Sequence, residues 1–233
     1  MINPKAGILP LRRSFFSPRN EINRLMAALV LFSIMMLLAR IAYTGKVTFI
    51  FLPWNLFLAW IPYAITQVLT ARGRWIENKW MFLFFFILWI GFVPNSFYIL
   101  TDLFHLGDHY NDRLVPQWYD LALILSYAWT GLMLGILSVR QMEKICGRFS
   151  LGRHELLFIY PVMWLNALGV YTGRYLRFNS WDVISNPFLI FHDILAIVIH
   201  PVIYRNAWGM ILCYSILMTL IYLLLKKLSR DIL

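Results

Sequence analysis

The sequence predicts an all-α, polytopic membrane helix bundle, and three observations carry that prediction. Of the 233 residues, 61% are apolar and only 14% are charged, whereas soluble domains are about 45–50% apolar and about 25% charged. A soluble core cannot bury so much apolar surface behind a polar exterior, so the surrounding solvent is expected to be lipid. Six apolar stretches are also long enough to cross about 30 Å of hydrocarbon, which takes roughly 20 helical residues each.

The first three predicted crossings lie near residues 24–43, 49–70 and 80–100. A basic arm, residues 1–23, precedes them, and residues 24–233 are expected to form a single transmembrane domain. The first stretch begins too far downstream for an export signal and lacks a small-residue cleavage site, so it is expected to remain as a membrane helix. The next two contain Pro62 and Pro94, which should kink their helices.

The other three crossings are predicted near residues 118–139, 155–174 and 208–227. Glycines spaced four apart occur in two of these stretches, at Gly131 and Gly135 and again at Gly169 and Gly173. This spacing lets helix backbones approach closely in lipid, within one chain or across a homo-oligomer, and the intramolecular alternative is favoured. The apolar stretch 188–204 is too short to span and is expected to be interfacial or re-entrant.

The distribution of basic residues predicts the orientation. Fifteen of the 21 Lys and Arg residues fall in the arm, the second-to-third and fourth-to-fifth loops, and the tail. Only six fall on the other side: Arg40, Lys46, Arg113, Arg174, Arg177 and Arg205. Both termini are therefore expected in the cytoplasm, and the same rule explains the net charge of +10 without nucleic acid as a partner.

Polar residues gather at the end of the third stretch, on the predicted outer face. If the helix continues, Asn95, Tyr98, Asp102 and His105 form one stripe, because they are separated by three, four and three residues. An Asp at such a depth is costly unless it is paired or faces a wet cavity, so Asp102 is the strongest candidate for a functional residue.

Other predicted elements bring further polar groups to the same depth. Asp120 opens the fourth crossing, and Arg174 and Arg177 share a face at the end of the fifth. An Arg side chain offers a planar, charged fork for carboxylate or phosphate. The remaining candidates follow in the chain: Asn179, Asp182, His192, Asp193 and His200.

These blocks resemble a bacterial multi-pass membrane family catalogued as a domain of unknown function, number 1361. The resemblance rests on Pro94-Asn95 with Tyr98 and Thr101-Asp102-Leu103, on Trp118-Tyr119-Asp120, and on Gly173-Arg174 through Asn179-Ser180-Trp181-Asp182. It covers roughly residues 50–195. It implies a bacterial inner-membrane protein and brings no established activity.

One hypothesis for the function is an enzyme acting at the outer leaflet on a lipid or a phosphate-bearing substrate. Asp102, His105 and Asp120 are its candidate catalytic residues, and a divalent metal held by His105, His192 and Asp193 could activate water. The substrate-binding candidates are Asn95, Tyr98, Arg174, Arg177, Asn179 and Asp182. No H-E-x-x-H spacing supports the metal, so the identity of any cofactor stays open.

Two alternatives do not involve chemistry. The same residues could bind or move an anionic lipid, a polyprenyl phosphate or a small solute. They could instead form an ion-pair network in which Asp102, Asp120 and Asp182 pair with Arg174 and Arg177, holding the helix ends together. The lipid bilayer is a partner in every case.

Overall fold

The structure is a computed structural model and describes residues 18–106, 115–147, 155–178 and 185–231, all of whose regular elements are helical. In chain order the elements are α1 (Pro18–Thr44), α2 (Phe51–Ala71), α3 (Gly73–Glu77), α4 (Lys79–Tyr98), η1 (Ile99–Leu106), α5 (Gln117–Cys146), α6 (Glu155–Arg174), α8 (Pro187–Ile199) and α9 (Arg205–Asp231). The predicted all-α class is therefore confirmed. The arm upstream of residue 18 lies outside the described residues.

A long helix covers each of the six predicted crossings. Five helical segments in the described part are long and apolar enough to cross a membrane: Glu21–Thr44, Lys79–Leu106, Gln117–Cys146, Leu156–Arg174 and Arg205–Ser229. Helix α2 covers the predicted second crossing but is not among these five. Helix α8 is the predicted short apolar segment, and its 13 residues are too few to span.

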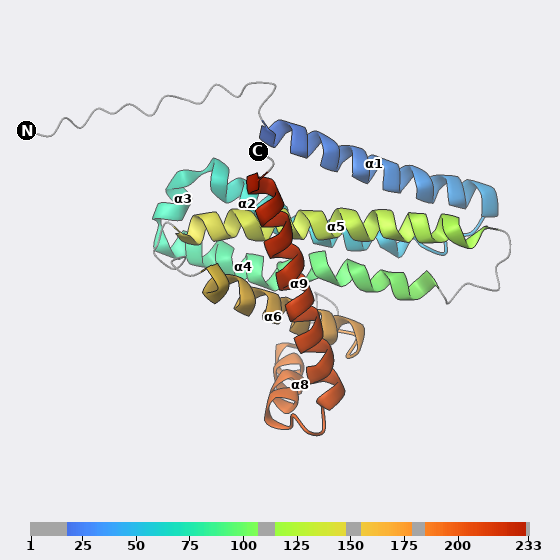
Figure 1. Cartoon of the computed structure of the whole chain (residues 1–233). Coiled ribbons are helices and arrows are strands. Elements are labelled where there is room, and N and C mark those ends of the chain that lie inside the picture. The colour runs from blue at the N-terminus through green and yellow to red at the C-terminus, as the bar shows by residue number, and fades with distance from the viewer. Residues whose placement is uncertain (1–17, 107–114, 148–154, 179–184, 232–233) are drawn as a thin grey trace, which may run out of the picture.

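Helix α2 packs mainly against α5 and α4, whereas α1 lies on α5 (Figure 1). One face of α2 is buried in these contacts, including Leu52, Ala59 and Leu69, each with no exposed surface. Because protein rather than lipid surrounds this face, α2 tolerates Asn55, Thr66 and other polar residues within its length.

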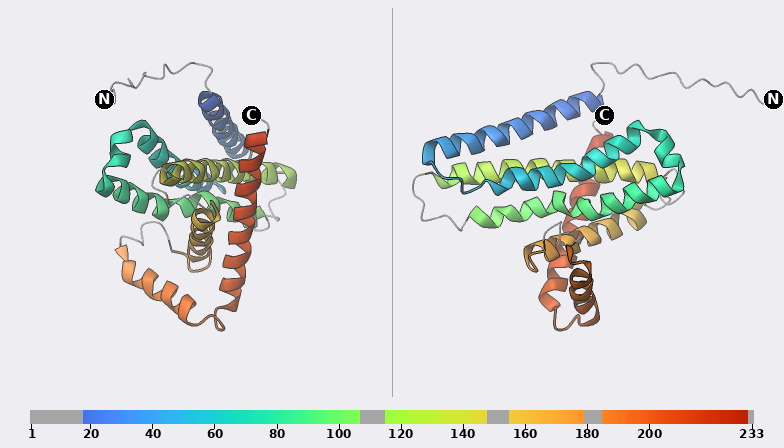
Figure 2. Two further views of the ribbon diagram at one scale, coloured as in Figure 1. Left: turned by 60° about the vertical axis from the view of Figure 1, so that its left-hand side comes forward. Right: turned by 180° about the vertical axis from the view of Figure 1, so that it is seen from behind.

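Helix α9 crosses the α1–α5 group at a steep angle, as views of the chain from different sides show (Figures 1 and 2). It packs chiefly on α6, and near its end Tyr222 and Lys226 both donate hydrogen bonds to Glu143 of α5. Membrane helices tilt by up to about 40° from the normal. Two helices that each tilt this far in opposite directions can cross steeply and still both span, so the predicted sixth crossing stays a prediction.

The glycine pairs of α5 and α6 pack within the chain, as the sequence analysis favoured. A Cβ at Gly131 would lie 2.6 Å from Ile99, and one at Gly135 would lie 2.7 Å from Ser96. A Cβ at Gly169 would lie 2.6 Å from the ring of Pro94. Carbon atoms normally approach to about 3.5–4.0 Å, so only glycine permits these helix contacts.

Two boundaries differ from the sequence-based expectation. Helix α5 runs on from 139 to Cys146, because the polar segment after the apolar stretch consists largely of good helix formers. The third crossing does not continue as an α-helix to its end: after Tyr98 it narrows into the 3-10 helix η1. This change of pitch alters the direction of Asp102 and His105.

Candidate functional site: a cavity between α2, α4 and α6

A cavity of about 400 Å³ lies where α2 begins and where α4 and α6 end. Its polar lining comes from Asn55 of α2, Asn95 and Tyr98 of α4, and Thr172 of α6. The rest of the lining is apolar or glycine: Trp54, Leu58, Ile90, Gly91, Pro94, Leu165, Leu168, Gly169, Gly173, Phe178, Ile190 and Ile194. A mostly apolar cavity of this size with a few convergent polar groups is typical of a ligand site.

The predicted polar stripe divides into two parts in the structure. Asn95 and Tyr98 lie on the α-helical turn that lines the cavity, whereas Asp102 and His105 lie on η1 and are not part of the lining. In a 3-10 helix residues three apart eclipse one another, so Asp102 and His105 remain on one side of η1. Eight residues is long for such a helix, and longer 3-10 segments mark strain or functional sites.

Asp102 connects to the cavity through Asn55. Its carboxylate accepts a hydrogen bond of 2.8 Å from Nδ2 of Asn55, whose side chain lines the cavity. Asp102 is only 1% exposed, and His105 and Arg174 are close enough to interact electrostatically with its carboxylate. The structure therefore brings Asp102 and Arg174 near one another, although neither side chain lines the cavity.

Arg174 forms a hydrogen bond with His105 across the gap between α6 and η1. Its Nη1 lies 3.0 Å from Nε2 of His105, and its guanidinium lies over the ring of Phe104, 5.3 Å from the centroid. Arginine can only donate, so Nε2 of His105 is the acceptor in this hydrogen bond. His105 also packs against Phe51 of α2, with ring centroids 5.0 Å apart.

Arg177 stands just beyond α6 in a backbone conformation that favours glycine. Its φ is 59°, and it is the only non-glycine residue with a positive φ among the described residues. The turn allows the amide of Phe178 to reach back to the carbonyl of Thr172 at 3.3 Å, and Phe178 then lines the cavity. The exposed side chain of Arg177 is outside the lining.

The structure gives Asp120 a different partner from those considered in the sequence analysis. Its two carboxylate oxygens accept from Nε and Nη2 of Arg40 at 2.7 and 3.0 Å. Arg40 is 2% exposed and also lies over the ring of Phe49, 4.5 Å from its centroid. This bidentate pair ties α1 to α5, and Asp120 does not line the cavity, so its predicted catalytic role gains no support.

The predicted metal ligands are not brought together. Within the described segments, no three His, Cys, Asp or Glu side chains cluster closely enough to hold a metal ion. His105 contacts Arg174, whereas the exposed His192 lies 3.2 Å from Asp193 on α8. Asn179 and Asp182 lie outside the described residues. His200 ends α8 as its C-cap and is exposed.

Two residues of this region were missed by the sequence analysis. Asn55 connects the cavity to Asp102, and the signal that could have identified it is a lone amide within an apolar stretch, since such side chains bond across helices. Arg40 was counted only among the basic residues of the predicted outer side, although its position inside the first stretch already required a buried partner.

Comparison with known families gives one match. The sequence model described as "Protein of unknown function (DUF1361)" matches residues 54–221, which include the cavity-lining helices and the Asp102, His105 and Arg174 positions. No curated protein and no solved structure matches the chain.

Proposed function

This chain belongs to the DUF1361 family, and we propose that it binds a phosphate-bearing lipid in the cavity between α2, α4 and α6. The family description names no activity, so the proposal rests on the geometry of the cavity. We place this cavity at the outer face of a bacterial inner membrane, with both termini cytoplasmic, on the basis of the charge distribution.

The link from Asn55 to Asp102 is the observation that carries the proposal. A carboxylate with 1% exposure at membrane depth needs a compensating network, and here that network starts from a side chain lining a cavity. A purely structural pair would not need an adjacent cavity of about 400 Å³. The apolar walls suit a lipid chain, and the amide and hydroxyl groups suit its polar headgroup.

The charge of Arg174 supports an anionic headgroup. Among the described residues its one hydrogen bond is to the ring of His105, so no carboxylate is directly paired with its guanidinium there. The neighbouring Arg177 adds a second positive charge in the same turn of chain. Arginine recognises phosphate bidentately, and Arg174, which is not itself part of the lining, directly follows the lining residues Thr172 and Gly173 at the end of α6.

A second candidate is an enzyme that acts on the same lipid. The specific observation in its favour is that Asp102 and His105 lie within electrostatic range of one another. Such a pair can accept and return a proton. Incubation with phosphatidylglycerol vesicles followed by mass analysis of the lipid would distinguish the two candidates, because binding alone leaves the lipid mass unchanged.

The binding proposal is tested by native mass spectrometry of the protein taken from the membrane in mild detergent. Phosphatidylglycerol and a long polyprenyl phosphate serve as separate added probes. We expect one phosphate-bearing lipid to be retained, and we expect Arg174→Gln and Asn55→Ala each to lower its occupancy about tenfold, which corresponds to about 1.4 kcal/mol.

Arg205→Gln is the matched control, because Arg205 is exposed at the start of α9 and does not line the cavity. It should retain the lipid as the wild type does. Equal occupancy in Arg174→Gln, Asn55→Ala and Arg205→Gln would contradict the proposal and leave the ion-pair network as the explanation of these residues.

A further inference from the structure

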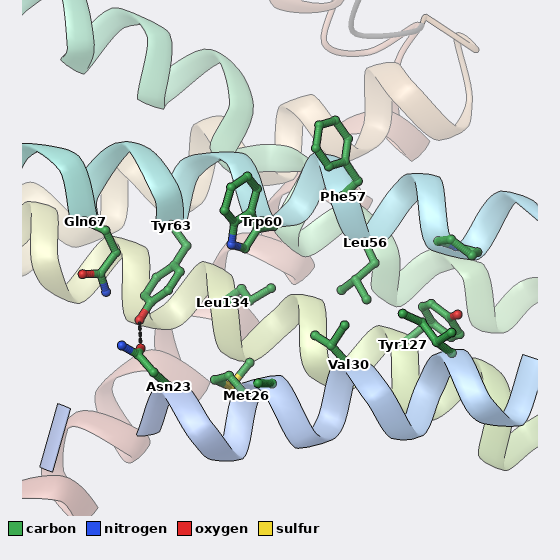
Figure 3. A pocket seen from close by; sticks show the side chains of 13 residues that line it. Asn23, Met26, Val30, Leu56, Phe57, Trp60, Tyr63, Gln67, Tyr127 and Leu134 are labelled. Atoms are coloured by element: carbon green, nitrogen blue, oxygen red, sulfur yellow. Dashed lines mark hydrogen bonds between the residues drawn. The ribbon is translucent and has the colours of Figure 1, made fainter. Parts of the chain in front are cut away.

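A second cavity, of about 560 Å³, lies between α1, α2 and α5 on the far side of α2 from the first (Figure 3). It extends along α1 from Asn23 to Ile34, which at about 1.5 Å per residue is about 17 Å. One leaflet of a bilayer contributes about half of the 30 Å hydrocarbon thickness. The cavity therefore has about the length of one leaflet's acyl chains.

Most of the lining is apolar, and its walls merge with lipid-facing surface. Met26, Val30 and Leu56 line its interior, while Phe57 and Trp60 line its edge and are each 48% exposed. Adjacent residues of α1 on the outer surface are also exposed and apolar, among them Leu31 at 62% and Met35 at 57%. An acyl chain can thus enter sideways from the surrounding bilayer.

The polar groups of this cavity concentrate at one end. There the hydroxyl of Tyr63 donates to Oδ1 of Asn23 at 2.6 Å, and Gln67 lies one helical turn further along α2 (Figure 3). The exposed Arg24 follows Asn23, and the arm before it in the sequence carries Lys5, Arg12, Arg13 and Arg19. Basic residues beside a membrane helix attract anionic headgroups.

We propose that this groove binds an anionic phospholipid of the cytoplasmic leaflet. One acyl chain lies lengthwise between α1 and α2 against α5. Its ester oxygens lie at the Asn23–Tyr63–Gln67 end and its headgroup lies beside Arg24. This site is separate from the cavity of the proposed function, and neither depends on the other.

Tyr127 distinguishes an acyl chain from other occupants. It is fully buried, it lines the groove away from the polar end, and its hydroxyl oxygen has no hydrogen-bond partner among the described residues. A hydrocarbon chain offers this hydroxyl no acceptor, whereas a ligand with a carbonyl in its apolar body would. Tyr127→Phe is therefore expected to leave phospholipid binding unchanged.

The test uses vesicles containing phosphatidylglycerol with a photoactivatable diazirine in one acyl chain. After illumination, peptide mass spectrometry should find the label on the groove residues Met26, Val30 and Leu56. Val30→Trp should fill the groove and reduce this labelling at least fivefold. Leu31→Trp, which adds the same ring to the exposed face, should not. The melting temperature of each variant in detergent shows whether it is folded.

Ala27→Leu and its control Ala28→Leu repeat the comparison with a smaller change, in case Val30→Trp fails to fold. Equal labelling in both members of each folded pair, or labelling spread evenly over exposed α1 residues, would overturn the proposal. Loss of labelling in Tyr127→Phe would also overturn it, in favour of an oxygen-bearing occupant.

A phosphatidylcholine probe should label less than phosphatidylglycerol at low salt, and equal labelling would refute the anionic preference. Arg174→Gln should leave all labelling here unchanged.

Discussion

Replacement of Gly169 by Ala tests the helix packing that forms the wall of the cavity between α2, α4 and α6. The added Cβ would lie 2.6 and 2.8 Å from two ring carbons of Pro94, whereas carbon contacts are normally about 3.5–4.0 Å. The proline ring cannot rotate away, so α6 must move from α4 by about 1 Å. Overpacking of this kind costs about 1–3 kcal/mol.

Gly209→Ala is the matched control, because a Cβ at this helical glycine of α9 meets no atom within 4 Å. Both variants gain about 0.8–1 kcal/mol of helix propensity, so the difference between them isolates the clash. We expect Gly169→Ala to be less stable than Gly209→Ala by about 1–3 kcal/mol when unfolding in mixed micelles is followed by tryptophan fluorescence. Equal stabilities would refute the packing of α6 on α4 described here.

Three other changes have defined outcomes. Asp120→Asn leaves the buried Arg40 without its counter-charge and should lower the free energy of unfolding by about 3–5 kcal/mol. The double variant Arg40→Met with Asp120→Leu should recover most of that loss of stability. If the single variant lies within about 1 kcal/mol of wild type in the same unfolding assay, the buried pair is contradicted. Arg177→Gly should raise stability by about 1 kcal/mol, because it removes the strain of a left-handed residue, and Arg177→Ala should not; equal melting temperatures would show that the turn is unstrained. A double-mutant cycle of Asn55→Ala and Asp102→Ala should give a coupling of about 1.5–3 kcal/mol, the range for a hydrogen bond to a charged group, and additive losses would separate the two residues.

The sequence predicts the helices of this chain well because the hydrophobic length needed to cross lipid is a local property. Each predicted stretch is helical, and the glycine pairs pack inside the chain as expected. The steep crossing of α9 has no comparable local signal. It arises from contacts with α6 and from the attachment of Tyr222 and Lys226 to Glu143, residues about 80 positions apart.

Part of the candidate site could also be predicted, from the positions of its residues at the ends of the crossings. Asn95, Tyr98, Asp102, His105 and Arg174 do gather at one end of the bundle, because the ends of neighbouring crossings meet there. Their pairing depends on helix pitch and rotation, which spacing alone does not give. The change to a 3-10 helix at Ile99 directs Asp102 toward Asn55, and the rotation of α1 brings Arg40 to Asp120.

The most direct test of the central claim is a high-resolution cryo-electron microscopy map of the protein in nanodiscs that contain phosphatidylglycerol. The account predicts elongated density in the cavity between α2, α4 and α6, with a phosphate peak within about 3 Å of the Arg174 guanidinium. A map that shows Asp102 and Arg174 in separate surroundings, or the cavity filled by the chain's own side chains, would contradict it.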